Sequence, residues 1–426
     1  MTPPPPRRGP RPLMLHLAMD QGLRGLQPGA TMLSALFPFA SATSNGASPG
    51  WNPAATMGIL PDAALIAGIA AYRRHPYHRA LSDPPVLWSE EETRLLDYAP
   101  GSDAPPVLFV PSLINRATVL DLAEGNSVVR FMAASGLRPL LLDWGWPGPI
   151  ERRFTLTDYI AGRLERAIAA VGQKVTLAGY CMGGMLALAA ALRRPDLVRA
   201  LALLATPWDF HAEDAARAKS VAAMLPLFEP LMAATSTLPI DALQTLFALL
   251  EPGAVPDKYR AFAGMDQESD RARLFVALED WVNDGVPLGA PVARECLGQW
   301  YGANAPARLE WRIAGAVVDP ATLTCPSFAA VPARDRIVPP ESALALARAL
   351  PGAVLHQPGA GHIGMAAGPR AESTLLRPLA AWLLAQQDGS RIASLAQRRR
   401  AGGKRGNVDG KRGNAAGSMP GGAVQS

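Results

Sequence analysis

The stretch that decides the fold is VTLAGYCMGGMLALAA, residues 175–190. Its first half is an apolar run and its second half is rich in Ala, Leu and Met, so the pattern predicts a buried strand, a tight turn and a helix. The turn holds the motif G-x-C-x-G, from Gly179 through Cys181 to Gly183. Such a turn strains its central residue and needs small neighbours two positions away on either side. The pattern therefore predicts a nucleophile elbow that exposes the thiol of Cys181.

A buried structural cysteine is the alternative for an isolated match of this motif, because Gly and Ala are abundant in the chain. Two later residues favour the elbow. Asp335 follows the short apolar run 326–332, and His362 lies in a glycine-rich loop after the run 353–356. Each alone is typical of a solvated loop carboxylate or a turn histidine. Together, in the order nucleophile, acid, histidine and each after a strand, they predict a Cys-His-Asp triad.

Strands alternate with helices on both sides of the elbow, and this alternation indicates a parallel sheet with right-handed crossovers. The fold class is α/β, an α/β-hydrolase fold with a mostly parallel central sheet and a helical cap insertion. Between about residues 206 and 305 the pattern changes to successive helices broken by prolines. Apolar cap residues there suit an acyl chain, although most are equally explained as the cap's own core. The strands and helices on which this rests are 107–110, 128–134, 139–142, 155–171, 175–180, 185–194 and 200–205.

The chain divides into four parts. Residues 1–12 are rich in Pro and Arg and are expected to be disordered, and 13–105 are expected to be mainly helical. Residues 106–387 form the predicted catalytic domain, with the cap at about 206–305. Residues 388–426 are expected to be a disordered basic tail, because they contain almost no large apolar residues. Residues 391–426 carry eight Lys and Arg against one Asp, a net charge of +7, which leaves −2 for the rest of a chain of net charge +5. The tail suits nucleic acid, an anionic lipid surface or an acidic partner, or is simply solvated.

Three cysteines in a chain of 426 residues, without metal-type spacing, favour a reducing compartment and argue against a disulfide framework or a zinc site. Cys296 and Cys325 are expected to be small buried residues. The first twelve residues have no apolar segment of a secretory signal, and the apolar segment 63–72 is too short to span a bilayer. We therefore expect a cytoplasmic protein without a transmembrane segment, and association with a granule stays open.

Several stretches together resemble the polyhydroxyalkanoate synthases, which make poly-3-hydroxybutyrate and related polyesters, and among them the catalytic subunit of the shorter-chain kind called class III. The resemblance runs from about Val107 to Leu384. The family has a His directly after its catalytic Asp, where this chain has Arg336. The residues that carry the resemblance are Pro111 to Arg116, Asp121, Leu122, Leu142, Asp143, Trp144, Gly145, the cysteine elbow, Trp281, Asn283, Asp284, Asp335 and His362 with their flanks.

The resemblance implies an acyltransferase that takes 3-hydroxyacyl groups from coenzyme A onto Cys181 as a thioester. The hydroxyl of the next unit, deprotonated by His362 or Asp335, then attacks, and the products are a polyester and free coenzyme A. The substrate is a 3-hydroxyacyl-CoA, and neither a cofactor nor a metal is expected. A homodimer, a second synthase subunit and the surface of a polyester granule stay open as partners.

The chemistry of the elbow can be derived from the residues themselves. A free thiol has a pKa of about 8.5 and reacts as the thiolate, so His362 and the N-terminus of the following helix are expected to activate Cys181. Asp335 would hold the imidazole in its useful tautomer. The fold places the oxyanion donors at the backbone N–H of Met182 and at one in the loop 111–113, for which we take Leu113.

Two other functions stay open. A cysteine hydrolase, such as an esterase, a thioesterase or a dienelactone hydrolase, would use the same triad and admit water. Dienelactone hydrolases share the elbow but are compact and lack a long cap. A non-catalytic granule protein would be expected to have lost a member of the triad. Arg336, as a fixed positive charge, is expected to favour ionised Asp335 and to slow elongation relative to acylation.

Overall fold

The computed structural model describes residues 6–25, 62–251 and 253–386. The chain forms two units, Met1–Ala380 and Ala381–Ser426, and the described part of the second, 381–386, is helical. The expected disordered tail, 388–426, lies outside the described residues, as do residues 1–5 and 26–61 of the N-terminal parts.

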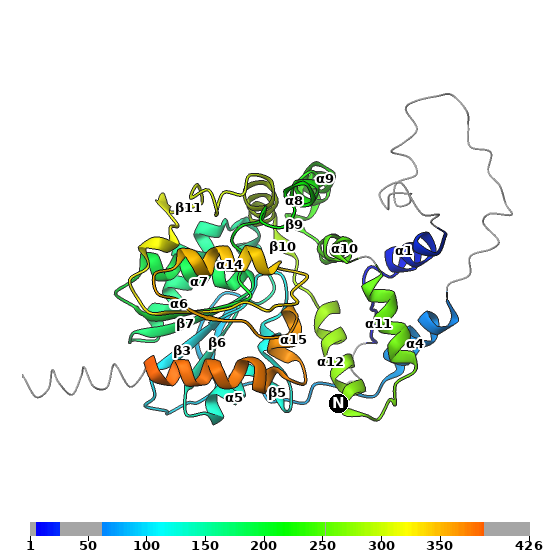
Figure 1. Ribbon diagram of the computed structural model, residues 1–426, viewed down its shortest axis with the longest axis horizontal. Helices are drawn as coiled ribbons and strands as arrows, with labels where there is room; N and C mark the ends of the chain where they lie inside the picture. Colours follow the sequence, from blue (N-terminus) through cyan, green and yellow to red (C-terminus); the bar gives the residue numbers. More distant parts are fainter. Residues whose placement is uncertain (1–5, 26–61, 252, 387–426) are drawn as a thin grey trace, which may run out of the picture. The chain divides into compact units, whose positions relative to one another are not determined.

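An eight-stranded sheet forms the centre of the first unit (Figure 1). Its strand order is β1-β2-β6-β3-β7-β8-β13-β14. Strands β6, β3, β7, β8, β13 and β14 are parallel, whereas β1 and β2 pair antiparallel. This confirms the predicted mostly parallel sheet. The strands are β1 Val86–Glu90, β2 Thr93–Asp97, β3 Pro106–Val110, β6 Arg138–Asp143, β7 Val175–Tyr180, β8 Val198–Leu204, β13 Ser327–Ala330 and β14 Val354–His356.

The central strands are buried on both faces, as the continuous apolar runs require. Every residue of β3 and β7 is buried. Helix α7 packs against β7 and β8, and α5 packs against β6 on the opposite face of the sheet (Figure 1). The helices around the sheet are η1 Ala117–Leu120, α5 Val128–Ala134, η2 Glu151–Arg153, η3 Asp158–Leu164, α6 Glu165–Ala170, α7 Met182–Arg193, η5 Pro320–Thr322, α14 Pro340–Ala349, α15 His362–Ala367 and η6 Glu372–Leu376.

Strands β1 and β2 correct one expectation, because residues 86–97 belong to the region 13–105 that the sequence predicts to be mainly helical. In the structure they form a hairpin that joins the sheet through β6. In β2, Thr93 and Leu95 are fully buried, and the exposed Arg94 between them pairs with Asp143 of β6 at 2.8 Å. Because β2 lies between β1 and β6, β1 forms this edge of the sheet. The sheet therefore begins about twenty residues before the expected boundary at 106.

Residues 6–12 correct the expectation of disorder at the N-terminus. Arg7 forms an ion pair with Asp280 at 2.6 Å, and Arg11 pairs with Asp241 at 3.0 Å. The backbone N–H of Arg11 also donates to Asn283 Oδ1 at 3.0 Å. Composition indicated a solvated segment, but acidic and amide groups more than two hundred residues away hold it against the cap.

The segment between β8 and β11 is built almost wholly of helices. Two short strands, β9 and β10, pair antiparallel within it. Helix α11 packs against α4, where Tyr259 and Phe262 meet Leu65, Ile69 and Tyr72 in a small core of their own. The elements are α8 Ala215–Ala222, α9 Leu225–Thr235, β9 Thr237–Leu238, α10 Ile240–Leu250, α11 Ala254–Ala263, α12 Asp270–Asn283, β10 Leu288–Gly289, α13 Ala290–Arg294 and η4 Glu295–Gly302; outside the cap lie α1 Leu13–Gly25, α4 Ala63–Arg74, β4 Asp121–Ala123, β5 Asn126–Ser127, β11 Arg312–Ile313 and β12 Ala316–Val317.

Candidate active site

The predicted site residues meet at one edge of the sheet. Cys181 follows β7, Asp335 follows β13 and His362 follows β14, and these three strands run parallel. The loop at Pro111 follows β3, which is also parallel to β7. Because the carboxyl ends of parallel strands lie at the same edge, the topology brings together residues up to 251 positions apart.

Cys181 occupies the strained turn that the sequence predicts. Its backbone angles are φ 55° and ψ −129°, a region that non-glycine residues rarely adopt. Two hydrogen bonds hold it there: its N–H donates to Leu204 O at 2.8 Å, and its carbonyl accepts the N–H of Gly184 at 2.9 Å. The turn therefore lies between β7 and α7 with its backbone fixed from both sides.

The glycines of the elbow are required by space. A Cβ on Gly183 would overlap the carbonyl oxygens of Val110 and Pro111, and one on Gly184 would overlap Thr206. A Cβ on Gly179 would overlap the backbone of Gly184. Close approach of three backbone segments is thus the physical reason for the motif, and it places Met182, the first residue of α7, beside the Pro111 loop.

Asp335 is a fully buried carboxylate whose two oxygens have different partners. Oδ1 accepts the backbone N–H groups of Ile337 and Val338, both at 2.9 Å. Oδ2 lies 2.7 Å from Nδ1 of His362. The two backbone donors fix the carboxylate, so that its free oxygen orients the imidazole.

His362 connects the carboxylate to the cysteine. It is the first residue of α15, and its carbonyl accepts the hydroxyl of Tyr180 at 3.2 Å. Its Nδ1 is hydrogen-bonded to Asp335, and Cys181 lines the same cavity as the ring. Burial alone lowers the pKa of His362, but the charge and hydrogen bond of Cys181 together with those of Asp335 outweigh it and raise the pKa to about 10. The imidazole is therefore positively charged at neutral pH, and a positive charge beside a thiol stabilises its thiolate.

This pKa gives a prediction that NMR can check. In protein labelled on histidine, the ring signals of His362 should titrate near pH 10, and in Cys181→Ala the midpoint should fall, because the thiolate no longer stabilises the imidazolium. Since the pKa in the folded state lies above the ordinary value of 6.5, the stability contributed by this proton is complete below pH 6.5 and is lost as the pH rises to about 10. A midpoint near 6.5 in both proteins would contradict the coupling.

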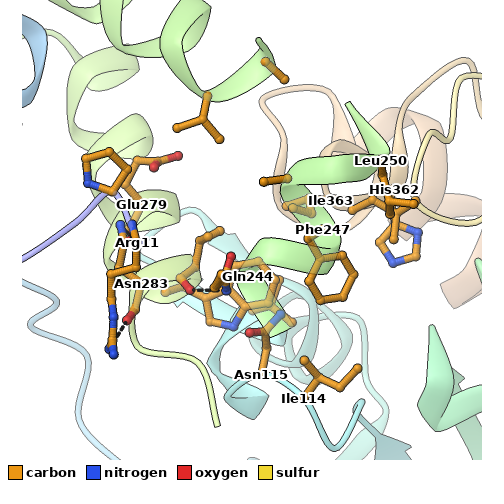
Figure 2. A pocket seen from close by; sticks show the side chains of 18 of the residues that line it. Arg11, Ile114, Asn115, Gln244, Phe247, Leu250, Glu279, Asn283, His362 and Ile363 are labelled. Atoms are coloured by element: carbon orange, nitrogen blue, oxygen red, sulfur yellow. Dashed lines mark hydrogen bonds between the residues drawn. The ribbon is translucent and has the colours of Figure 1, made fainter. Parts of the chain in front are cut away.

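Two cavities meet at Cys181. The larger, of about 300 Å³, runs from Cys181 and His362 to Arg11 and Asn283 at its far end. Figure 2 shows His362 and Leu250 at one end, Phe247 and Ile114 between, and Arg11, Glu279 and Asn283 at the other. The second cavity, of about 130 Å³, is lined by Cys181 and Met182 and by aromatic residues of the cap. The nucleophile is therefore accessible from two directions.

The Asp-Trp-Gly turn supports the loop after β3. The indole N–H of Trp144 donates to Pro111 O at 3.0 Å, and Trp144 is buried. Gly145 has φ 71° and its Cα packs against the backbone of Glu92. Pro111 and Ser112 line the larger cavity, whereas the side chain of Leu113 is buried in the core. Trp144 thus fixes the loop in which the second oxyanion donor is expected.

The guanidinium of Arg336 pairs with a residue of the cap, and the expected effect of its charge on Asp335 stays a prediction. The partner is Glu251 at the end of α10, and the side chain of Arg336 is 73% exposed. The Asp335 carboxylate is instead occupied by His362 and two backbone N–H groups. Adjacent residues on a turn point in different directions, so position 336 faces the cap and the mouths of both cavities.

Sequence reasoning missed three contributors to this site: Glu251, Tyr180 and the N-terminal segment at Arg11. Only Tyr180 gave a signal, since a tyrosine in a fully buried strand needs a partner for its hydroxyl. Cys296 is buried and Cys325 is half-buried, and neither is disulfide-bonded. Across residues 6–25, 62–251 and 253–386, no group of three or more His, Cys, Asp and Glu side chains is placed to hold a metal, and no helix is both long and apolar enough to cross a membrane.

Comparison with known proteins gives consistent similarities. Residues 105–369 match the family described as alpha/beta hydrolase fold. The poly(3-hydroxyalkanoate) polymerase subunit PhaC of Synechocystis sp. is 30% identical over 320 residues, which cover 71% of this chain and 84% of the relative. The subunit of the same name from Allochromatium vinosum is 28% identical over 323 residues, covering 71% and 88%. Among solved structures, a monoacylglycerol lipase of Paleococcus ferrophilus is 16% identical with a TM-score of 0.44, covering 69% of this chain and 99% of the lipase.

Proposed function

Because the chain belongs to the α/β-hydrolase fold family and within it to the poly(3-hydroxyalkanoate) polymerases, we propose that it polymerises 3-hydroxyacyl groups from coenzyme A thioesters through a thioester on Cys181. The observation that supports the residue assignment is the hydrogen bond between Asp335 and His362 at the cavity that Cys181 also lines, with the cysteine on a strained elbow. It supports roles for Cys181 as nucleophile, His362 as base and Asp335 as orienting carboxylate in covalent acyl transfer.

The charged state of His362 suits the first half of the reaction. The Cys181 thiolate attacks the carbonyl carbon of the substrate thioester, and the bond from that carbon to the sulfur of coenzyme A breaks. The imidazolium of His362 gives its proton to the departing thiolate, so free coenzyme A leaves as a thiol. The acyl group remains on Cys181 and His362 is left neutral.

The neutral imidazole then serves as the base for elongation. It takes the proton from the 3-hydroxyl group of the next unit, whose oxygen attacks the thioester on Cys181. A new ester bond forms, the bond to the cysteine sulfur breaks, and the thiolate and imidazolium are restored. Asp335 orients the ring throughout. The N–H of Met182 at the start of α7 and one N–H of the loop that Trp144 fixes would stabilise the two oxyanions.

We also propose the substrate and the cellular location that the sequence analysis led us to expect. The substrate is a 3-hydroxyacyl-CoA, and the protein acts in the cytoplasm at the surface of the polyester that it makes. The same triad would hydrolyse the thioester if water reached it, which is the alternative function.

Incubation of the purified protein with 3-hydroxybutyryl-CoA separates the two functions. We expect release of free thiol to be matched by polyester, measured by methanolysis and gas chromatography. Thiol release matched by free 3-hydroxybutyrate would make the protein a hydrolase. A protein that neither releases thiol nor carries an acyl group on Cys181 would contradict both.

A further inference from the structure

A small apolar pocket lies in the cap behind the cavities that reach Cys181. Its volume is about 60 Å³, and its walls come mainly from α10 and from the segment formed by α13 and η4. Leu243 and Leu246 line it from α10, Ala293 from α13 and Leu297 from η4. Within the part of the chain that the structure describes, none of the residues lining this pocket is Asp, Glu, Lys, Arg or His. Such a pocket is suited to aliphatic groups and unsuited to water.

The pocket continues from the second cavity at Cys181, because the two share six lining residues: Ile114, Val221, Phe247, Leu250, Cys296 and Tyr301. Figure 2 shows three of these: Leu250 lies beside His362, and Phe247 and Ile114 lie between that end and the end with Arg11 and Asn283. The rest of the second cavity is also lined by charged residues, namely Asp209, Glu213, Asp214, Arg217 and Arg336, but none of the six shared residues is charged. An acyl group on the Cys181 sulfur can therefore enter the pocket through an uncharged overlap.

The two titratable groups among the six shared residues are uncharged. Burial raises the pKa of the Cys296 thiol well above its ordinary value, with a smaller effect from Glu295. Burial likewise raises the pKa of Tyr301. Both side chains keep their protons at neutral pH, so the entrance to the pocket offers no charge to a polar ligand.

From these observations, and on the basis of the proposed function, we infer that the pocket binds the alkyl substituent on C3 of the acyl group and that Leu246, Ala293 and Leu297 limit its length. A volume of 60 Å³ holds about four to six water-sized groups, so a substituent of a few carbons fits and a longer one does not. Placing the alkyl group here turns the other substituent of C3, the hydroxyl, away from the apolar wall, as elongation requires.

The test uses one variant that fills the pocket and one that enlarges it. Ala293→Leu places a larger side chain in the pocket, and Leu246→Ala removes one from its half-buried wall. Leu231→Ala is the matched control, because this leucine is exposed on α9 in the same cap and does not line the pocket. Thermal unfolding checks that each variant is folded.

The measurement is kcat/KM for acylation of Cys181 by p-nitrophenyl butyrate, hexanoate and octanoate, together with CoA release from 3-hydroxybutyryl-CoA and 3-hydroxyhexanoyl-CoA. We expect Ala293→Leu to lower the hexanoyl-to-butyryl ratio about tenfold or more, and Leu246→Ala to raise the octanoyl-to-hexanoyl ratio by a similar factor. The acyl groups of each pair differ by two methylenes, and one methylene in an apolar pocket discriminates by roughly 10 to 200-fold. Leu231→Ala should keep the ratios of the wild type.

Acylation by the esters tests the pocket assignment separately from the polymerase function. If the ratios shift as expected but the acyl group is lost to water, the pocket assignment stands and the polymerase function falls. If folded Ala293→Leu and Leu246→Ala keep the wild-type ratios, the pocket assignment is overturned while the polymerase function stands. If no ester or thioester acylates Cys181 in the wild type, both fall.

Discussion

Cys181→Ala is expected to abolish acyl transfer, with a loss of about 10⁴ to 10⁶-fold, because removal of the nucleophile disables the whole triad at once. Intact-protein mass spectrometry after incubation with 3-hydroxybutyryl-CoA should show one added acyl group on the wild type and none on the variant. The fold should remain, since alanine carries the same Cβ as cysteine and meets the same backbone strain at φ 55°. The melting temperature should accordingly change little.

Cys325→Ala is the matched control for this experiment. Cys325 is a half-buried thiol in the segment just before β13, and it lies outside the cavities that reach the elbow. This variant should be acylated as the wild type is. An acyl group found on Cys181→Ala, or lost in Cys325→Ala, would place the nucleophile elsewhere and refute the triad.

Asp335→Asn is expected to lower the rate of acylation by about 10⁴-fold, the scale seen when a triad carboxylate becomes an amide. The amide oxygen can still accept the N–H groups of Ile337 and Val338. Its NH₂ group then faces Nδ1 of His362, where a donor meets a donor and the useful tautomer is lost. The same change removes the negative charge that helps to hold the His362 proton, so the pKa of His362 should fall as well.

Asp319→Asn offers a control for the chemistry of the substitution. Asp319 also accepts a backbone N–H, that of Ala321 at 2.9 Å, and it lies at the start of the short helix η5 away from the cavities. In the Asp319→Asn variant, Cys181 should be acylated at the wild-type rate. A loss of less than about tenfold in Asp335→Asn, with the fold intact, would mean that the carboxylate does not orient the base.

The arrangement of the site could be predicted because each part of it is locally encoded. The elbow needs glycines at fixed spacing, and Asp335 and His362 each follow a short apolar strand, so the pattern and the chain order sufficed. The parallel sheet then determines that these residues meet. The predicted Cys-His-Asp grouping is therefore a consequence of topology as much as of the three residues.

The features that could not be predicted depend on ion pairs between residues that lie far apart in the sequence. The charge of Arg336 is evident from the sequence, but its partner Glu251 lies 85 residues earlier, at the end of a cap helix. The contact of Arg7 with Asp280 is of the same kind. The sequence does not predict the hairpin of β1 and β2, because a charged strand residue such as Arg94 is stabilised by its cross-strand neighbour Asp143, which local composition does not reveal.

The elbow restricts the residue type at its glycine positions but not at the position of the nucleophile, residue 181. Positions 179, 183 and 184 admit no side chain, because the atoms that a methyl group would meet are backbone or the buried Thr206. The side chain at position 181 instead faces open cavities on two sides. The surrounding backbone therefore does not depend on the side chain at position 181. A serine or an aspartate there would be exposed to the same cavities and would lie at the same helix N-terminus. A different nucleophile therefore needs a change at one position only, whereas a methyl group at any of the three glycines would force neighbouring atoms to shift.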